Sequence, residues 1–269
     1  MDKTPEEKDT SGSIIEHFAT STLPLFHGPL VKIRIEPSNR EYTVSKPLLC
    51  NESPVFSAMF KGNFRESQEE TATLQEMEGV VSIQSIEALI QWLYLRTINF
   101  DIDTRFHELH IVAAVELARL AEMYGITKIE PQLAQYVKGR FAKCGYRHKK
   151  IRIGRAVLPD TDDWILGTFL RDGHPVRWIM AQALVFWYLR NENEEYPGFD
   201  VAQGCPKFGV DLLHEVRLAL NTLKPISSAT FKDPITGKRR YLVKGEHDED
   251  MMKMMKVEDE DDEGEEDDE

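Results

Sequence analysis

The residue types that most often carry out catalysis are present, but their spacing matches no catalytic motif. His107 and His110 lie three residues apart with Glu108 between them, yet the His-Glu-x-x-His spacing of a zinc protease is absent. The sequence has no glycine-rich loop of the kind that cradles phosphate, and no nucleophile motif. We therefore interpret the pair as the polar start of a helix and predict a non-enzymatic chain without catalytic, cofactor-binding or metal-binding residues.

The cysteines and the apolar runs indicate the compartment. Cys50, Cys144 and Cys205 are scattered without a Cys-x-x-Cys pair, which argues against a disulfide scaffold and a zinc finger. The N-terminus has no apolar stretch of a signal peptide, and the longest uncharged apolar run is far shorter than the ~20 residues that span a bilayer. We expect an intracellular protein of the cytoplasm or nucleus, neither secreted nor membrane-spanning.

A basic segment, residues 138–155, is the most unusual charge run before the C-terminal tail. It contains one histidine, no acid and eight basic residues: Lys138, Arg140, Lys143, Arg147, Lys149, Lys150, Arg152 and Arg155. Such a run can contact nucleic-acid phosphates, dock an acidic segment of the same chain, or be a solvated helix end and linker. The linker interpretation is favoured because no aromatic interleaving or nucleic-acid module accompanies it. A nucleus-associated regulator that contacts nucleic acid remains the alternative function.

The net charge of −13 resides in the C-terminal tail. Residues 246–269 hold 15 acids and two lysines, which sum to −13, so the remaining 31 acids and 31 bases balance. Acidic residues at this density cannot bury enough apolar surface to fold, so we predict a disordered tail. The tail would face the basic segment and mask it at low salt.

Apolar periodicity predicts an α+β fold. Val31, Ile33 and Ile35 alternate with basic residues as in a half-buried strand, and a second strand at 42–44 completes a hairpin. Short helices are expected after Ser45 and Ser53, and a short strand at 71–74. Longer helices are expected at 82–93, 105–124, 127–141, 161–170, 176–190 and 210–223, with a loop at 191–208. One core is expected to contain Leu49, Val55, Phe56, Phe60, Leu89, Leu93, Leu117 and Leu120.

Three strings in the first half of the chain carry a resemblance to a known family. They are LLCNESPVFSAMFKGNFRES at 48–67, Trp-Leu-Tyr at 92–94 and LARLAEMYG at 117–125. In this order and spacing they resemble the BTB/POZ domain, particularly its fungal form, over about residues 25–143. The sequence departs from many family members at Leu30, where an Asp is common, and at Ser45, where a His is common. The resemblance implies a small sheet with a helical cluster and a role in protein–protein assembly.

The resemblance also implies two contact sites. In cullin-binding members a hydrophobic-x-Glu triplet packs against the cullin scaffold of ubiquitin ligases, and Phe64 and Glu66 stand at the matching positions. We favour the alternative, in which Phe64 is covered by the chain's own C-terminal helices and no cullin is bound. Relatives often dimerise through a helix before the first strand, where the apolar residues here are Ile14, Ile15 and Phe18.

These observations predict an interaction module with five segments. A mobile N-terminal segment, 1–24, precedes a BTB/POZ-like domain, 25–143, and a basic linker, 144–159. A helical C-terminal region, 160–224, is followed by a disordered tail, 225–269, which is acidic from residue 246. The expected function is self-association or hetero-association with protein partners, possible arrangements being a homodimer and a cullin-type ligase adaptor.

Overall fold

A computed structural model describes residues 18–143, 167, 169–190, 202, 204–223 and 230–242. The chain forms two compact units, residues 1–180 and residues 181–269, which are described separately. The linker predicted at 144–159, most of the helix predicted at 161–170, and the acidic residues from 246 lie outside the described residues. In the described part of the chain, no helix combines the length and the apolar character needed to cross a membrane.

The first unit is built on a three-stranded sheet with the order β2-β1-β3. Strand β1, Leu30–Glu36, pairs antiparallel with β2, Arg40–Ser45, and parallel with β3, Thr71–Gln75. Val31, Ile33 and Ile35 are almost completely buried, while the residues between them face outward. This alternation is the period-two pattern of a sheet with one covered face, so the predicted hairpin is confirmed.

Two serine caps start the short helices that follow β2. The Ser45 hydroxyl accepts from the backbone N–H of Leu48 at 3.4 Å and begins α3, Lys46–Glu52. The Ser53 hydroxyl accepts from Phe56 N at 3.1 Å and begins α4, Pro54–Lys61. Each cap satisfies one of the four N–H groups that a helix start leaves unpaired, and a proline sits in the first turn of both helices.

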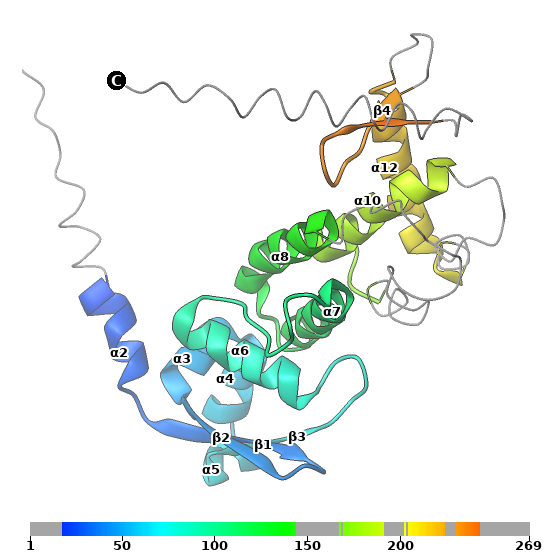
Figure 1. The fold of residues 1–269 in the computed structure, drawn as a ribbon. Helices are drawn as coiled ribbons and strands as arrows, with labels where there is room; N and C mark the ends of the chain where they lie inside the picture. The colour runs from blue at the N-terminus through cyan, green and yellow to red at the C-terminus, as the bar shows by residue number, and fades with distance from the viewer. Residues whose placement is uncertain are drawn as a thin grey trace, which may run out of the picture. The chain divides into compact units, whose positions relative to one another are not determined.

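Helices cover the buried face of the sheet (Figure 1). After α5, Arg65–Glu69, come α6, Ile83–Leu95, and α7, His107–Met123. The short 3-10 helix η2, Thr127–Ile129, leads into α8, Glu130–Lys143. Helix α7 packs between α6 and α8. The predicted core is confirmed for seven of its eight residues, which are at most 1% exposed, whereas Val55 is half-buried.

The N-terminal segment predicted to be mobile, 1–24, becomes helical at residue 18. A π-helical turn, η1, covers Phe18–Thr22, and α2 covers Leu23–Phe26. The Ser45 hydroxyl donates to the carbonyl of Leu25, and the Phe26 ring lies 5.8 Å from that of Tyr94. A Cβ at Gly28 would lie 2.1 Å from the Pro47 ring, so the chain passes this point in direct contact with α3. These contacts hold the segment, and sequence periodicity could not reveal them.

The second unit contains helices and a small hairpin. Helix α10, Pro175–Arg190, begins in the first unit, and α12 spans Pro206–Leu220. Strands β4, Thr230–Lys232, and β5, Arg239–Tyr241, pair antiparallel. The prediction of disorder throughout 225–269 is therefore wrong for 230–241. Phe231 is completely buried, and the Asp233 carboxylate accepts the backbone N–H groups of Ile235 and Thr236 at 2.8 and 3.2 Å, which fixes the turn.

The core assignment predicts the effect of two truncations. Phe56→Ala and Leu117→Ala should each lower the free energy of unfolding by about 2–5 kcal/mol, since both side chains are fully buried and leave a cavity. Urea denaturation measures the change. Leu95→Ala is the matched control, because Leu95 is 64% exposed and its truncation should cost little. Parent-like stability in both core variants would contradict the assignment.

Candidate functional site

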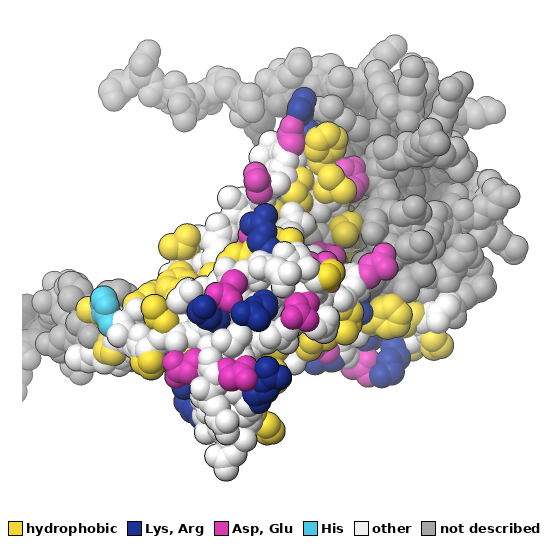
Figure 2. Space-filling view, turned by 90° about the horizontal axis from the view of Figure 1, so that it is seen from below, with side chains coloured by type: hydrophobic (Ala, Val, Ile, Leu, Met, Phe, Trp, Pro, Cys, Tyr) yellow, Lys and Arg dark blue, Asp and Glu magenta, His cyan; other side chains and the backbone are white. Residues whose placement is uncertain are grey.

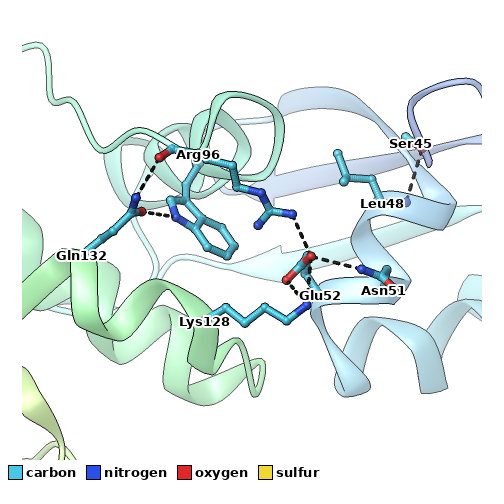
Figure 3. Close-up of polar contacts among 8 residues, drawn as sticks. Ser45, Leu48, Asn51, Glu52, Arg96, Lys128 and Gln132 are labelled. Carbon is cyan, nitrogen blue, oxygen red and sulfur yellow. Dashed lines mark hydrogen bonds and ion pairs between the residues drawn. The ribbon is translucent and has the colours of Figure 1, made fainter. Parts of the chain in front are cut away.

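A buried carboxylate holds together helices from three parts of the first unit (Figure 3). The Glu52 side chain, at the end of α3, is only 2% exposed. Arg96 approaches it with Nη2 2.7 Å from Oε1, and the Lys128 ammonium lies 3.3 Å from Oε2. Asn51 donates its amide to Oε1 at 3.1 Å. Because these groups come from α3, the end of α6 and η2, one charge joins elements that are far apart in the sequence.

The same cluster fixes the end of α6. Arg96 ends this helix in the left-handed conformation with φ 55°, and its guanidinium lies 4.4 Å from the Trp92 ring centroid. The Trp92 indole donates to Gln132 Oε1 at 2.6 Å, and the Gln132 amide donates to the Arg96 carbonyl at 3.0 Å. The Gln132 side chain on α8 therefore bonds both a side chain and a main-chain carbonyl at the end of α6.

The ionisation of Glu52 follows from two opposing effects. Burial is the largest single effect and disfavours the charged form, but the hydrogen bonds and charges of Arg96 and Lys128 together hold the pKa of Glu52 below its usual value of 4.5. The carboxylate is therefore ionised at neutral pH, and it stabilises the fold in that form.

Phe64 forms an exposed corner between α4 and α5. Gly62 ends α4, and its N–H donates to the Ala58 carbonyl at 2.9 Å. A Cβ at Gly62 would lie 2.6 Å from that carbonyl oxygen and 2.8 Å from the Phe64 ring, so the ring lies directly against the glycine backbone. Phe64 is the N-cap residue of α5 and is 58% exposed. The expected cover by C-terminal helices is therefore not found within the residues described for the first unit.

Glu66 lies in the first turn of α5, beside the exposed ring. Among the described residues it forms no ion pair, whereas its neighbours Arg65 and Glu69 pair with each other at 2.7 Å. Glu70 ends α5 with φ 48° and pairs with Lys46 at 3.1 Å. The corner thus presents an apolar ring and a carboxylate two residues apart, on a short helix that is anchored at both ends.

The outer face of the sheet carries mixed charge. In Figure 2, the face seen from below shows basic and acidic side chains interspersed, without a large field of one sign. Glu41 pairs with both Lys32 at 2.7 Å and Arg34 at 3.1 Å on adjacent strands, and these bases hold the pKa of Glu41 below its usual value. On this face, the Glu41 carboxylate therefore balances basic side chains of the neighbouring strand.

The remaining predicted site residues are only partly described. Lys138, Arg140 and Lys143 lie on α8, but Lys138 and Arg140 point about 160° apart around the helix axis. The guanidinium of Arg140 lies 4.9 Å from the Tyr136 ring and donates to its hydroxyl at 3.0 Å, so it is engaged within the fold. The other predicted basic residues lie outside the described residues: Arg147, Lys149, Lys150, Arg152 and Arg155. So do Ile14 and Ile15, and the side chain of Phe18.

Sequence reasoning missed two buried histidines. His110, predicted as part of a polar helix start, is 1% exposed, and its Nδ1 lies 2.7 Å from the Tyr136 hydroxyl. Burial lowers the pKa of His110. Both partners of this hydrogen bond are on helices that are separated by a turn, so no local spacing could have indicated it.

The second buried histidine, His174, lies just before α10. Burial lowers the pKa of His174 to about 4. Arg171 makes two bonds to the Glu130 carboxylate at 2.6 and 2.8 Å, and its N–H reaches Glu122 at 3.2 Å. The first unit therefore extends to Met180, beyond the boundary predicted at residue 160.

The fold and the sequence of this unit agree on one family. A comparison with protein-family models matches residues 28–140 to the BTB/POZ domain. The first unit carries a BTB/POZ domain. BTB/POZ domains are protein–protein interaction modules and are generally non-enzymatic. A search of curated proteins found no match to the chain. Within the described residues, no three His, Cys, Asp or Glu side chains gather as a metal site.

The buried carboxylate makes the stability of the BTB/POZ domain depend on pH. Glu52→Gln keeps the side-chain size but removes the charge, so we expect a loss of about 1–3 kcal/mol at pH 7. The folded-state pKa of Glu52 is below 4.5, so this contribution is present above the unfolded pKa and disappears as the pH falls through the folded pKa.

Thermal melting of the parent and the variant at pH 7 and pH 3 measures this difference. The two proteins should differ at pH 7, and the difference should shrink as the pH is lowered to 3. Glu76→Gln, at an exposed position, is the matched control and should differ from the parent at neither pH. A Glu52→Gln penalty of equal size at both pH values would show that the charge of Glu52 is not the cause.

Proposed function

We propose that this chain is a BTB/POZ adaptor that uses the corner at Phe64 and Glu66 to bind a cullin scaffold. The observation that supports the proposal is the 58% exposure of Phe64 on an anchored turn. Complete burial of a fully exposed Phe side chain contributes about 1.5–3 kcal/mol, and a ring that is 58% exposed can contribute roughly half of this when a partner covers it. The proposal extends the interaction role of BTB/POZ domains to a particular surface and a particular class of partner.

The geometry of the corner favours a binding role for both residues. Gly62 leaves room for the Phe64 ring against its backbone, so the ring has little conformational freedom to lose on binding. Glu66 lies two residues further on and can orient a partner through a polar contact at the rim of the buried ring.

Two sequence positions concern the form of BTB/POZ domain that we propose for this chain. Leu30 and Ser45 replace residues that are common in metazoan members, and Ser45 here caps α3 and donates to the Leu25 carbonyl. From the sequence resemblance we propose assignment to the fungal form, in which the domain pairs with itself or with other proteins. The helical second unit would then present further surface to a recruited partner.

Binding of a purified cullin N-terminal domain tests the corner directly. Phe64→Ala and Glu66→Ala should each weaken binding by about tenfold or more, with the melting temperature nearly unchanged, because the contact area is buried only in the complex. Isothermal titration calorimetry measures the affinity. Phe106→Ala is a matched control, since Phe106 is also a helix N-cap in this domain and is 50% exposed. Absence of parent binding, or equal weakening by Phe106→Ala, would contradict the proposal.

Self-association is expected to depend on the residues before α2. A truncated chain that begins at Leu25 keeps the Leu25 carbonyl that receives the Ser45 hydroxyl, and keeps Phe26 beside Tyr94. It removes Ile14, Ile15 and Phe18, the apolar residues proposed for a dimer contact. Sedimentation equilibrium should therefore give a larger mass for the 269-residue chain than for the truncated chain, each relative to its monomer. Equal oligomeric states would exclude these residues from the contact.

A further inference from the structure

One face of α12 in the second unit is apolar and exposed. Phe208, Leu212 and Val216 point inward and are at most 7% exposed. The outer side of the helix carries a stripe of three exposed side chains, between 37% and 67% exposed: Val210, Leu213 and Leu220. Arg217 lies within this stripe, whereas the exposed Leu218 points about 160° away from Leu220. Because a soluble helix usually has polar residues on its outer face, this second apolar side indicates a surface that something else covers.

The charges around this apolar face are basic. Within the described part of the second unit, the exposed charged residues are Lys207, Arg217, Lys232, Lys238 and Arg239. The acids of the same part are half-buried at Asp211 and buried at Glu215 and Asp233. Lys207 and Arg217 lie on α12 itself, among the exposed apolar residues. The face therefore suits a segment that is apolar in its centre and acidic at its ends.

The C-terminal sequence of the same chain has that composition. Four of the nine methionines occur within five residues, at positions 251, 252, 254 and 255, with Lys253 between them and Lys256 directly after them. Four acids precede them in residues 246–250, and eleven follow in residues 258–269. Methionine side chains are flexible and polarisable, so they adapt to an irregular apolar surface.

We propose that the methionine segment, residues 251–255, docks on the exposed apolar face of α12 in the same chain. The methionines cover Val210, Leu213 and Leu220, and the flanking acids lie against the basic residues of the helix and the hairpin. The second unit then contains a binding site for a short apolar segment bounded by acids, which this chain supplies itself.

The length of the intervening chain permits this contact. The hairpin is attached at the C-terminal end of α12, where Lys232 N donates to the Thr222 hydroxyl at 2.8 Å and Arg239 lies 3.5 Å from the Thr222 carbonyl. Eight residues, 243–250, separate Leu242 from Met251 and can span up to about 30 Å. Helix α12 has 15 residues and is about 22 Å long, so its apolar face is within reach.

The tether also raises the occupancy of a weak contact. A short linker gives an effective concentration on the order of millimolar, so an interaction of only millimolar affinity would be about half occupied. Opposite charges on the two surfaces increase this occupancy at low ionic strength. A second copy would have to supply the same segment at micromolar concentration, so the segment of the same chain is the favoured occupant.

Methionine oxidation of the 269-residue chain tests the proposal. Met77, 49% exposed, and Met180, 1% exposed, are internal references for an accessible and an inaccessible sulfur. In dilute hydrogen peroxide at low ionic strength, we expect the methionines at 251–255 to oxidise at least about twofold more slowly than Met77, because docking shields their sulfurs for about half of the time or more. Peptide mass spectrometry measures the rates at several protein concentrations.

Substitution of the helix face provides the decisive comparison. The double change Leu213→Ser and Leu220→Ser should raise the oxidation rate of residues 251–255 to that of Met77, while circular dichroism shows that the helices are retained. Leu95→Ser, at a residue 64% exposed in the first unit, is the matched control and should leave the protection intact. The proposal is overturned if the parent shows no protection, if the double variant keeps it, or if it increases with protein concentration, which would indicate a second copy.

Discussion

The position of α4, and with it the exposed corner, depends on the contact between Ser53 and Tyr124. The Ser53 hydroxyl donates to the Tyr124 carbonyl at 2.6 Å and accepts from Phe56 N at 3.1 Å. The Phe56 ring stacks on the Tyr124 ring with centroids 4.3 Å apart. One hydroxyl thus starts α4 and also satisfies the end of α7, where carbonyl groups have no partner within the helix. Without it, neither the aromatic stack nor the turn at Phe64 would have a fixed place.

Buried charge has a different role from this packing contact. Glu52 is nearly inaccessible, yet its partners Arg96 and Lys128 remain 43% and 66% exposed at their side chains. The cations therefore keep much of their hydration while they neutralise the carboxylate, which lowers the desolvation penalty of the pair. A charge of this kind specifies which helix ends must meet, because an unpaired carboxylate at this position would be strongly unfavourable.

The parts of the fold that were predictable from sequence are those set by neighbours along the chain. Alternating Val31, Ile33 and Ile35 indicated β1, and Ser45 and Ser53 marked two helix starts, because each pattern is complete within a few residues. The hairpin at 230–241 is also set by neighbouring residues, because its turn has the sequence Asp-Pro-x-Thr-Gly. The prediction of disorder after residue 225 did not use this turn signal. The charged partners of Glu52 and the hydroxyl partner of His110 were not predictable, since they lie 26 to 76 residues away.

The corner at Phe64 and Glu66 was likewise predictable only in part. Its residues, Phe64 and Glu66, were found from a motif, because the family resemblance places them by short spacing after Gly62. Their exposure was not predictable, since it depends on what the rest of the chain covers. The basic segment shows the converse: a continuous run in sequence is divided on α8 between different sides of the helix, and Arg140 is engaged by Tyr136.

The sheet topology has a consequence for how this domain can vary. Strand β2 ends and β3 begins at the same end of the sheet, on either side of β1, where Lys46 N donates to the Pro29 carbonyl and Lys32 N to the Glu70 carbonyl, both at 2.8 Å. The segment from α3 to α5 therefore begins and ends at points of the sheet that are only about 10 Å apart. Because its two ends lie close together, residues in the middle of this segment can change without moving either strand. Partner preference can therefore diverge while the sheet stays the same.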